Sequence, residues 1–394
     1  EKGVYISFNQ GDLFEPLRLN LPVVPVYDIQ IKNDELILAT HGRSFWILDG
    51  INLLRELRIG IDKEKPLLFK PSDKVRVIDQ LAGGLSDFAE ENIGKRYSSK
   101  IFGEPATYLE KKSNLGEITQ VYLDAGQNPQ EGLTIIYYLP EDFNSKFSIS
   151  IIDSSGQVVR VFNQDNTKSL SVKHGLNRVI WDLRDEGIPE LPDVSGGQSP
   201  FIAKKTSILS LPGTYTIRLS IGNESISEQN FDFVKDPRSE VSIDDLILQY
   251  DLQKDIQNKS LEIFNKVKYF RKIRDEVKQV VIRSRGLDQE NNLQKSVDLM
   301  LLKLSEIENE IVPFKSYDKI PPVGIPVGLY GKYKELKGGV SGGDYRPTKQ
   351  AYELFKDLNL RLEEKFSEID EIVKNDQFGV FKLVKELDIP DFSL

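Results

Sequence analysis

The sequence predicts a multidomain protein that is mainly β in its first part and helical in its last part. Up to about residue 236, apolar residues fall in short stretches with a period of two, separated by Gly, Pro, Asn and Ser. From Pro237 onward they recur at helical spacing. The chain has 394 residues. At about 100–200 residues per domain, this length predicts several domains, each with its own core.

Composition excludes several classes of function. The chain has 61 acidic and 52 basic residues and a net charge of −9, which argues against a nucleic-acid partner. It has no cysteine, so disulfides, thiolate nucleophiles and cysteine-ligated zinc are excluded. Since no apolar run approaches the roughly 18 residues that a membrane span needs, no transmembrane segment is expected.

Residues 1–80 read as short strands around one helix. Asn-Gln-Gly, Asn-Asp and His-Gly turn signals separate segments rich in β-branched and aromatic residues, which predicts antiparallel meanders. "INLLREL" (Ile51–Leu57) predicts a short helix. The strand candidates are "GVYISF" (Gly3–Phe8), "VYDIQI" (Val26–Ile31), "ELILAT" (Glu35–Thr40), "SFWILD" (Ser44–Asp49), "PLLFKP" (Pro66–Pro71) and "KVRVID" (Lys74–Asp79).

The middle of the chain predicts a linker and then a second β domain. Residues 81–118 carry many charges and little periodicity, which indicates a linker or draping loop. Residues 119–236 contain "LTIIYYL", "FSISIIDSSGQVVRVF", "GLNRVIWDLR" and "GTYTIRLSI". In the last of these, Tyr215, Ile217 and Leu219 share one face, which predicts a sheet with one wet face. Short strands at this spacing favour an immunoglobulin-like or fibronectin-like sandwich.

Residues 237–394 predict an antiparallel helical bundle or long helical hairpin. Ser242 and Asp245 form a capping-box start, and a seven-residue apolar rhythm follows until Arg285. A second helix is expected at about 288–312, a third from Pro347 to about 375, and a short closing helix over Phe378–Leu387. "GGVSGGDYRP" predicts a flexible connector between the second and third helices. Its glycines do not match the phosphate-loop motif, and no cofactor is expected.

The stretch "SFNQGDLF" (Ser7–Phe14) fits a degenerate form of the turn motif S-x-D-x-G-x-T-W, the Asp-box. Ser7 and Gly11 stand in place, while Asn9 replaces the aspartate and Phe14 the tryptophan. We expect Asn9 to hydrogen-bond backbone groups of its own turn and Gly11 to supply a positive φ. We also expect Phe14 to hold the turn against the core.

Together with "LPVVPVYDIQIKNDELILATHGRSFWILDG", this stretch closely resembles the last propeller repeats of bacterial BNR/Asp-box glycoside-hydrolase-like proteins. These are related in propeller fold to sortilin, sialidases and xyloglucan hydrolases. "AGQNPQEGLTIIYYL", "GLNRVIWDLR", "LPGTYTIRLSI" and "KDPR" resemble the sandwich that follows the propeller, and "SGGDYRPTKQAYELF" resembles the helical tail. The resemblance implies that residues 1–80 are the last propeller strands, with the upstream propeller as their partner.

Candidate site residues are few. Sialidase-like propellers hold a substrate carboxylate with arginines, so His41 and Arg43 of "THGR" are candidates for binding a glycan. The alternative, which we favour, is a strand turn set by Gly42, because the further arginines of such a site are not found around it. Tyr137, Tyr138, Trp181 and Tyr215 suggest a sugar platform, but aromatic residues on strands are usually core.

No catalytic or metal-binding residues are predicted in this chain. Asp28 and Asp49 fall on strands of the first region, but among so many acidic residues they are not assigned as a glycosidase pair. The only histidines are His41 and His174, and neither occurs in a zinc-site or triad motif. In the resembled hydrolases the catalytic acids lie in upstream blades.

The sequence therefore predicts a non-catalytic, C-terminal stabilising and docking region of an Asp-box propeller protein that resembles glycoside hydrolases. The chain starts at Glu1 with neither methionine nor signal sequence, and export to the periplasm or cell surface is expected from the resemblance. The alternative is an extracellular scaffold that binds a surface protein and has no hydrolase activity. Fold analogy does not separate the two.

Overall fold

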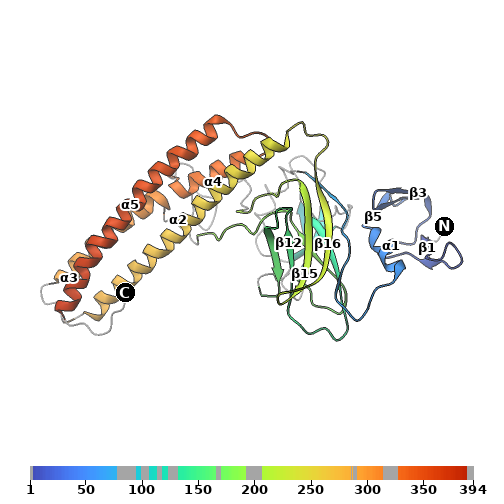
Figure 1. Ribbon diagram of the computed structural model, residues 1–394, viewed down its shortest axis with the longest axis horizontal. Helices are drawn as coiled ribbons and strands as arrows, with labels where there is room; N and C mark the ends of the chain where they lie inside the picture. The colour runs from blue at the N-terminus through green and yellow to red at the C-terminus, as the bar shows by residue number, and fades with distance from the viewer. Residues whose placement is uncertain are drawn as a thin grey trace. The chain divides into compact units, whose positions relative to one another are not determined.

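The computed structural model describes residues 3–77, 95–98, 106–112, 118–122, 132–165, 170–191, 206–284, 286, 291–313 and 327–387. The chain divides into two compact units (Figure 1). The first takes in the described residues of Glu1–Val77, Glu90–Glu186 and Pro212–Pro237. The second takes in those of Gly187–Leu211 and Arg238–Leu394.

The first unit begins with the predicted short strands. A two-stranded hairpin is followed by a three-stranded antiparallel sheet in the order β3-β4-β5, and then by one helix. Its small core comprises Val4, Leu36, Leu38 and Ile51. The elements are β1 (Tyr5–Ile6), β2 (Glu15–Pro16), β3 (Val26–Lys32), β4 (Glu35–Thr40), β5 (Phe45–Asp49) and α1 (Asn52–Ile59).

Two further sheets of this unit share one core. Their strand orders are β14-β11-β6 and β13-β12-β15-β16-β7. Trp181 contacts Tyr215 and Phe231 across the core, with ring centroids 5.6 and 6.1 Å apart. Alternate residues of β15 are buried, as its pattern predicts. The strands are β6 (Leu67–Leu68), β7 (Lys74–Arg76), β11 (Leu133–Leu139), β12 (Phe147–Ile152), β13 (Val158–Asn163), β14 (Gly175–Trp181), β15 (Gly213–Ile221) and β16 (Glu224–Lys235).

The segment after α1 contributes to both of these sheets. β6 pairs antiparallel with β11, while β7 pairs parallel with β16. Leu68 donates its N–H to Ser227 Oγ (3.0 Å) and accepts from Gln229 Nε2 (3.1 Å). The sequence prediction that residues 1–80 form one group of strands is therefore corrected, because β6 and β7 depend on partners more than 60 residues further along the chain.

Residues 81–118 contain strands where a linker was predicted. β8 (Lys95–Ser98), β9 (Ala106–Lys112) and β10 (Ile118–Tyr122) form an antiparallel sheet in the order β10-β9-β8. The charged residues of "YLEKK" hide the strand pattern in the sequence. An exposed strand tolerates such polar side chains, whereas a buried strand does not. The rest of the predicted linker lies outside the described residues.

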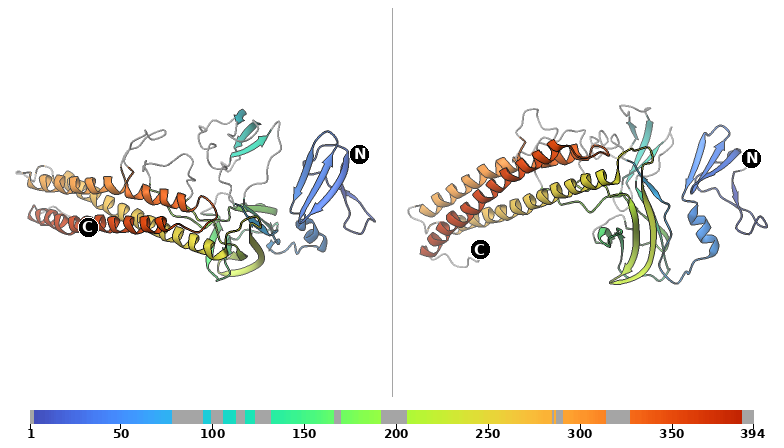
Figure 2. Two further views of the ribbon diagram at one scale, coloured as in Figure 1. Left: turned by 90° about the horizontal axis from the view of Figure 1, so that it is seen from above. Right: turned by 45° about the horizontal axis from the view of Figure 1, so that its top comes forward.

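The second unit is built on long helices that lie alongside one another (Figure 2). Ser242 accepts the Asp245 N–H at 3.1 Å, so the predicted cap opens α2 (Ile243–Arg283). The predicted second helix is α3 (Asn292–Ile311). Ile256, Ile263 and Phe270 are buried on α2 at the spacing read from the sequence. One core runs through the unit and includes residues of every helix.

Two helix predictions are corrected. A helix that was not predicted, α4 (Leu329–Val340), ends inside the predicted connector. Its side chains Tyr330, Tyr333 and Leu336 are buried. The third predicted helix and the closing helix form one continuous helix, α5 (Lys349–Glu386), capped by Thr348. Within the described residues, no helix combines the length and the apolar character that crossing a membrane demands.

Candidate functional site

The Asp-box turn is held by side-chain hydrogen bonds. The Gly11 N–H donates to Ser7 Oγ at 2.8 Å, and the Leu13 N–H donates to Asn9 Oδ1 at 2.9 Å. Ser7 Oγ also donates to Asn9 Oδ1 at 3.0 Å. Gly11 has φ +99°, a value that favours glycine. Asn9 thus supplies the acceptor oxygen that the expected turn needs, although it replaces an aspartate.

Phe14 does not hold this turn against the core of the described chain. Its side chain is 60% exposed, and Leu13 beside it is exposed to the same extent. The prediction for Phe14 is therefore wrong within the described residues. Local hydrogen bonds are enough to shape the turn. Burial of Phe14 needs an apolar surface in contact with its ring, and the described residues do not provide one.

The "THGR" segment forms the turn between β4 and β5. The Thr40 N–H and Thr40 Oγ1 both donate to Ser44 O, at 3.1 and 2.6 Å. Trp46 Nε1 donates to the Arg43 carbonyl at 3.1 Å. Gly42 has φ +78°, as expected for a turn that requires glycine. Arg43 therefore takes part in the turn through its backbone.

The structure places the exposed side chains of His41 and Arg43 on this one turn, and it places Tyr27 next to His41. The rings of Tyr27 and His41 are 5.1 Å apart. The Arg43 guanidinium forms no ion pair with a described residue. Binding of a glycan carboxylate by His41 and Arg43 stays a prediction.

Apolar side chains cover one face of the β3-β4-β5 sheet incompletely. Ile29 lies opposite Leu38, and Ile31 lies opposite Leu36, so all four share a face. Leu36 and Leu38 are buried under the loop that follows β2, but Ile29 is 50% exposed and Ile31 is 59% exposed. The part of this face that β3 contributes is therefore open to solvent.

The other face of the same sheet is apolar over β4 and β5, while β3 contributes Asp28, Gln30 and Lys32 to it. Phe45 lies opposite Ala39, and Ile47 lies opposite Ile37. Phe45 is 72% exposed and Ile47 is 55% exposed. Each face of this small sheet thus carries apolar side chains that are partly uncovered. We call these residues, Ile29 and Ile31 on one face and Phe45 and Ile47 on the other, the two open faces.

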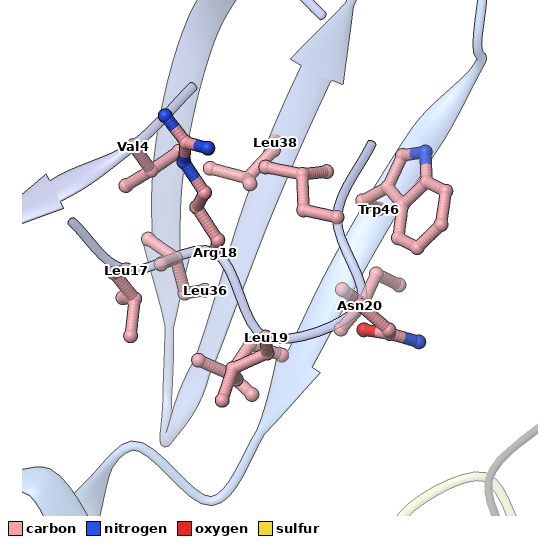
Figure 3. A pocket seen from close by; sticks show the side chains of 11 residues that line it. Val4, Leu17, Arg18, Leu19, Asn20, Leu36, Leu38 and Trp46 are labelled. Carbon is pink, nitrogen blue, oxygen red and sulfur yellow. The ribbon is translucent and has the colours of Figure 1, made fainter. Parts of the chain in front are cut away.

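A shallow pocket lies over the part of the sheet that carries Leu36 and Leu38 (Figure 3). The loop carrying Leu17, Leu19 and Leu21 passes over the sheet, and the pocket lies between this loop and Leu38 and Trp46. The pocket holds about 40 Å³, and its lining is mostly apolar side chains.

The aromatic candidates on the two sheets that share a core are structural. Trp181 and Tyr137 are fully buried and Tyr215 is 5% exposed, so these three do not form a sugar platform. Burial raises the pKa of the Tyr137 hydroxyl, which donates to Ser171 O at 2.5 Å. His174 is exposed, with Nδ1 2.8 Å from Pro140 O. Among the described residues, no three carboxylate or imidazole side chains gather as a metal site requires.

Helix α1 ties the sheet to the segment that follows it. Asn52 Nδ2 donates to the Lys70 carbonyl (2.5 Å), and the Lys70 N–H donates to Glu56 Oε1 (3.1 Å). Partial burial raises the pKa of the Glu56 carboxyl, although the Lys70 N–H opposes the shift. Arg55 pairs with Asp34 of the β3–β4 turn at 2.9 Å. These contacts join α1 both to the sheet and to Lys70, which follows β6. They involve none of the residues of the two open faces.

Comparison of the chain with protein-family models, with curated proteins and with solved structures gave no match.

Proposed function

We propose that this chain is a non-catalytic docking and stabilising unit that follows the β-propeller of an exported Asp-box protein resembling glycoside hydrolases. In this proposal the β3-β4-β5 sheet belongs to the last blade, and any hydrolytic chemistry belongs to the upstream blades. The observation that carries the proposal is the pair of open faces on one small sheet.

A sheet with uncovered apolar side chains on both faces suits a position between two neighbours. An antiparallel sheet with one solvated face alternates apolar and polar residues, whereas strands covered on both faces are apolar throughout. Propeller blades are stacked radially, so each blade contacts another on either side. Full burial of an Ile or Phe side chain contributes roughly 1.5–3 kcal/mol. Covering the four open side chains is therefore worth several kcal/mol to this sheet.

The remaining elements are proposed to support that docking. The β14-β11-β6 and β13-β12-β15-β16-β7 sheets share a core and consist largely of antiparallel neighbours, which supports assignment as an immunoglobulin-like or fibronectin-like sandwich. The helices α2, α3 and α5 lie alongside one another over a common core, which supports assignment as an antiparallel bundle.

Oxidative footprinting of the protein isolated from its source tests the docking proposal. Hydroxyl radicals modify exposed aromatic rings, so Tyr27 and Phe45, both 72% exposed, are reactive in the 394-residue chain alone. In the protein from its source, we expect both rings to be protected and the polypeptide to be heavier than 44.9 kDa. Tyr269, 49% exposed on α2, serves as the reference ring that stays reactive in both samples.

Equal modification of Tyr27 and Phe45 in the two samples, relative to Tyr269, contradicts the proposal. Protection without added mass points to a separate partner chain and favours the extracellular scaffold. Protection with added mass supports an upstream propeller. A paired-carboxylate cleft in that added chain then identifies a hydrolase.

A further inference from the structure

The connection between β14 and β15 passes through the helical unit. β14 ends at Trp181 and β15 begins at Gly213, and both strands belong to the first unit. The segment Gly187–Leu211 between them belongs to the second unit, together with the helices. The chain therefore leaves the sheets after β14, joins the helical unit and returns to form β15. We call the described residues 187–191 and 206–207 of this segment the strap.

The two arms of the strap are joined to each other. Thr206 Oγ1 donates to Ile188 O at 3.0 Å and accepts from the Ile188 N–H at 3.3 Å. The arms also approach closely at Gly187, where a Cβ atom would lie only 2.8 Å from Thr206 Oγ1 and 3.1 Å from the Ser207 nitrogen. Glycine is needed there for the backbone of one arm to lie against the other.

Helices α2 and α4 bind the second arm through its backbone carbonyls. Lys337 Nζ of α4 donates to Thr206 O and, at 3.3 Å, to Ser207 O. Gln257 of α2 is 4% exposed, and its Nε2 donates to the same Thr206 O at 2.9 Å. Hydrogen bonds from an ionised donor are stronger than those between neutral groups. Two successive carbonyls of the strap therefore depend on one lysine.

The first arm is held by an ion pair and by burial. Lys334 of α4 pairs with Glu190 at 2.9 Å. Because the Glu190 side chain is 52% exposed, this pair contributes little to stability. Leu191 is buried in the core that the helices share. Burial of Leu191 and the hydrogen bonds of Lys337 and Gln257 therefore hold the strap to the helices.

The strap lies between two residues that form the core of the sheets. Trp181 precedes it and Tyr215 follows it, and their rings, on strands of two different sheets, are 5.6 Å apart. With the strap released, residues 182–212 form one connection between these strands. With the strap bound, only residues 182–186 and 208–212 link it to them. The entropic cost of bringing the ends of a connection together rises with its length, so the bound strap favours association of the sheets.

We infer that the strap is a conformational coupling device, through which the folded helices stabilise the two sheets that share a core. Side chains of both α2 and α4 bind the carbonyl of Thr206, so the strap is held only while these helices are packed together. Loss of the helical structure then releases the connection between β14 and β15. The inference goes beyond the proposed function, since it involves neither the two open faces nor any upstream chain.

Urea unfolding of the 394-residue chain, followed by two signals, tests the inference. Trp181 fluorescence reports on the sheets once Trp46→Phe has removed the only other tryptophan, and far-UV ellipticity reports on the helices. Glu308→Ala serves as a perturbation outside the strap, because Glu308 of α3 accepts hydrogen bonds from two arginines of α2. With the strap intact, we expect Glu308→Ala to lower the urea midpoint of both signals.

Lys337→Met keeps the aliphatic part of the side chain and removes the donor. In this variant we expect Glu308→Ala to lower the midpoint of the helical signal alone, so that the two transitions separate. Lys337→Arg keeps a positively charged donor and is expected to restore the shared transition. Lys356→Met, at an exposed lysine of α5, is the matched control and should leave the effect of Glu308→Ala on both signals unchanged.

Each outcome decides the inference. If Glu308→Ala lowers the Trp181 midpoint equally with and without Lys337, coupling does not pass through the strap and the inference is overturned. If it lowers that midpoint in neither chain, the two units unfold independently and the inference also fails. If Lys337→Met does not fold, Gln257→Met removes the other donor to the strap and replaces it in the same comparison. The docking proposal is unaffected by all of these results, because its test is the protection of exposed rings.

Discussion

At the scale of the residue, the most buried charge in the described helices is Glu308. Its side chain on α3 is only 6% exposed and accepts from Arg271 Nε at 2.6 Å and from Arg274 Nη1 at 3.1 Å. Both arginines lie on α2, so three charged side chains cross one helix interface. Desolvation makes such a group costly unless every member keeps its partners.

Replacing Glu308 by Ala is therefore expected to destabilise the helical unit by about 3 kcal/mol, since two partly buried arginines lose their carboxylate. The urea midpoint followed by far-UV circular dichroism measures this loss. The control is Glu353→Ala on α5, whose pair with Lys349 is 62–85% exposed and is expected to change stability by less than about 0.5 kcal/mol. Equal midpoints for the two variants would show that water replaces the lost carboxylate.

At the scale of the element, α4 is held by a glutamine of α2. Gln249 is 2% exposed, and its Nε2 donates to Val340 O at 2.8 Å and to Gly343 O at 2.6 Å. Val340 is the last residue of α4, where helix carbonyls have no partner within the helix. Gln249 thus donates hydrogen bonds to one carbonyl at the end of α4 and to another just after it.

Replacing Gln249 by Met keeps the volume of the side chain and removes the donor. The carbonyls of Val340, which is buried, and of Gly343, which is half-buried, then lose a partner, with an expected cost of about 1–3 kcal/mol. Amide exchange at Ser341, whose N–H donates to Lys337 O, reports the loosened end of α4 and is expected to accelerate. Gln279→Met on the exposed side of α2 is the control and should leave Ser341 unchanged. The same acceleration in both variants would show that the methionine, and not the lost donor, disturbs α4.

The sequence predicts elements whose signals are local. α2 follows from the Ser242 cap and from a seven-residue apolar rhythm, both of which lie within the helix itself. α4 is missed because Gly338 and Gly339 each cost about 1 kcal/mol of helix propensity, which the burial of Tyr330 and neighbouring residues offsets. Tertiary packing decides that element, and packing partners are not visible in a short window of sequence.

The candidate site divides in the same way. The turn around Asn9 and Gly11 is predicted because its hydrogen bonds join residues two to four positions apart. The exposure of Phe14 is not predicted, since it depends on which surface lies across from the turn. The run Phe45–Leu48 was nevertheless a usable signal, because its lack of alternation is typical of a strand covered on both faces.

At the scale of the whole molecule, exposed apolar side chains are unevenly distributed. Of the 28 large apolar residues that are exposed in the described chain, twelve lie between Tyr5 and Ile59. The net charge of −9 at pH 7 opposes association of these regions in the isolated chain, and that repulsion vanishes near the isoelectric point of about 5.2. The isolated chain should therefore self-associate through its N-terminal sheet as the pH falls toward 5.2.

A double variant, Ile29→Lys with Ile47→Lys, tests this expectation by placing one charge on each open face. The variant changes the net charge from −9 to −7, so repulsion alone predicts more association, whereas loss of the apolar faces predicts less. We expect less, measured by sedimentation velocity or light scattering between pH 7 and pH 5.2. The control, Ser154→Lys with Asn223→Lys, makes the same change of charge at two exposed turns. If both double variants associate to the same extent, charge governs association, and the open faces are not the surface through which these chains meet.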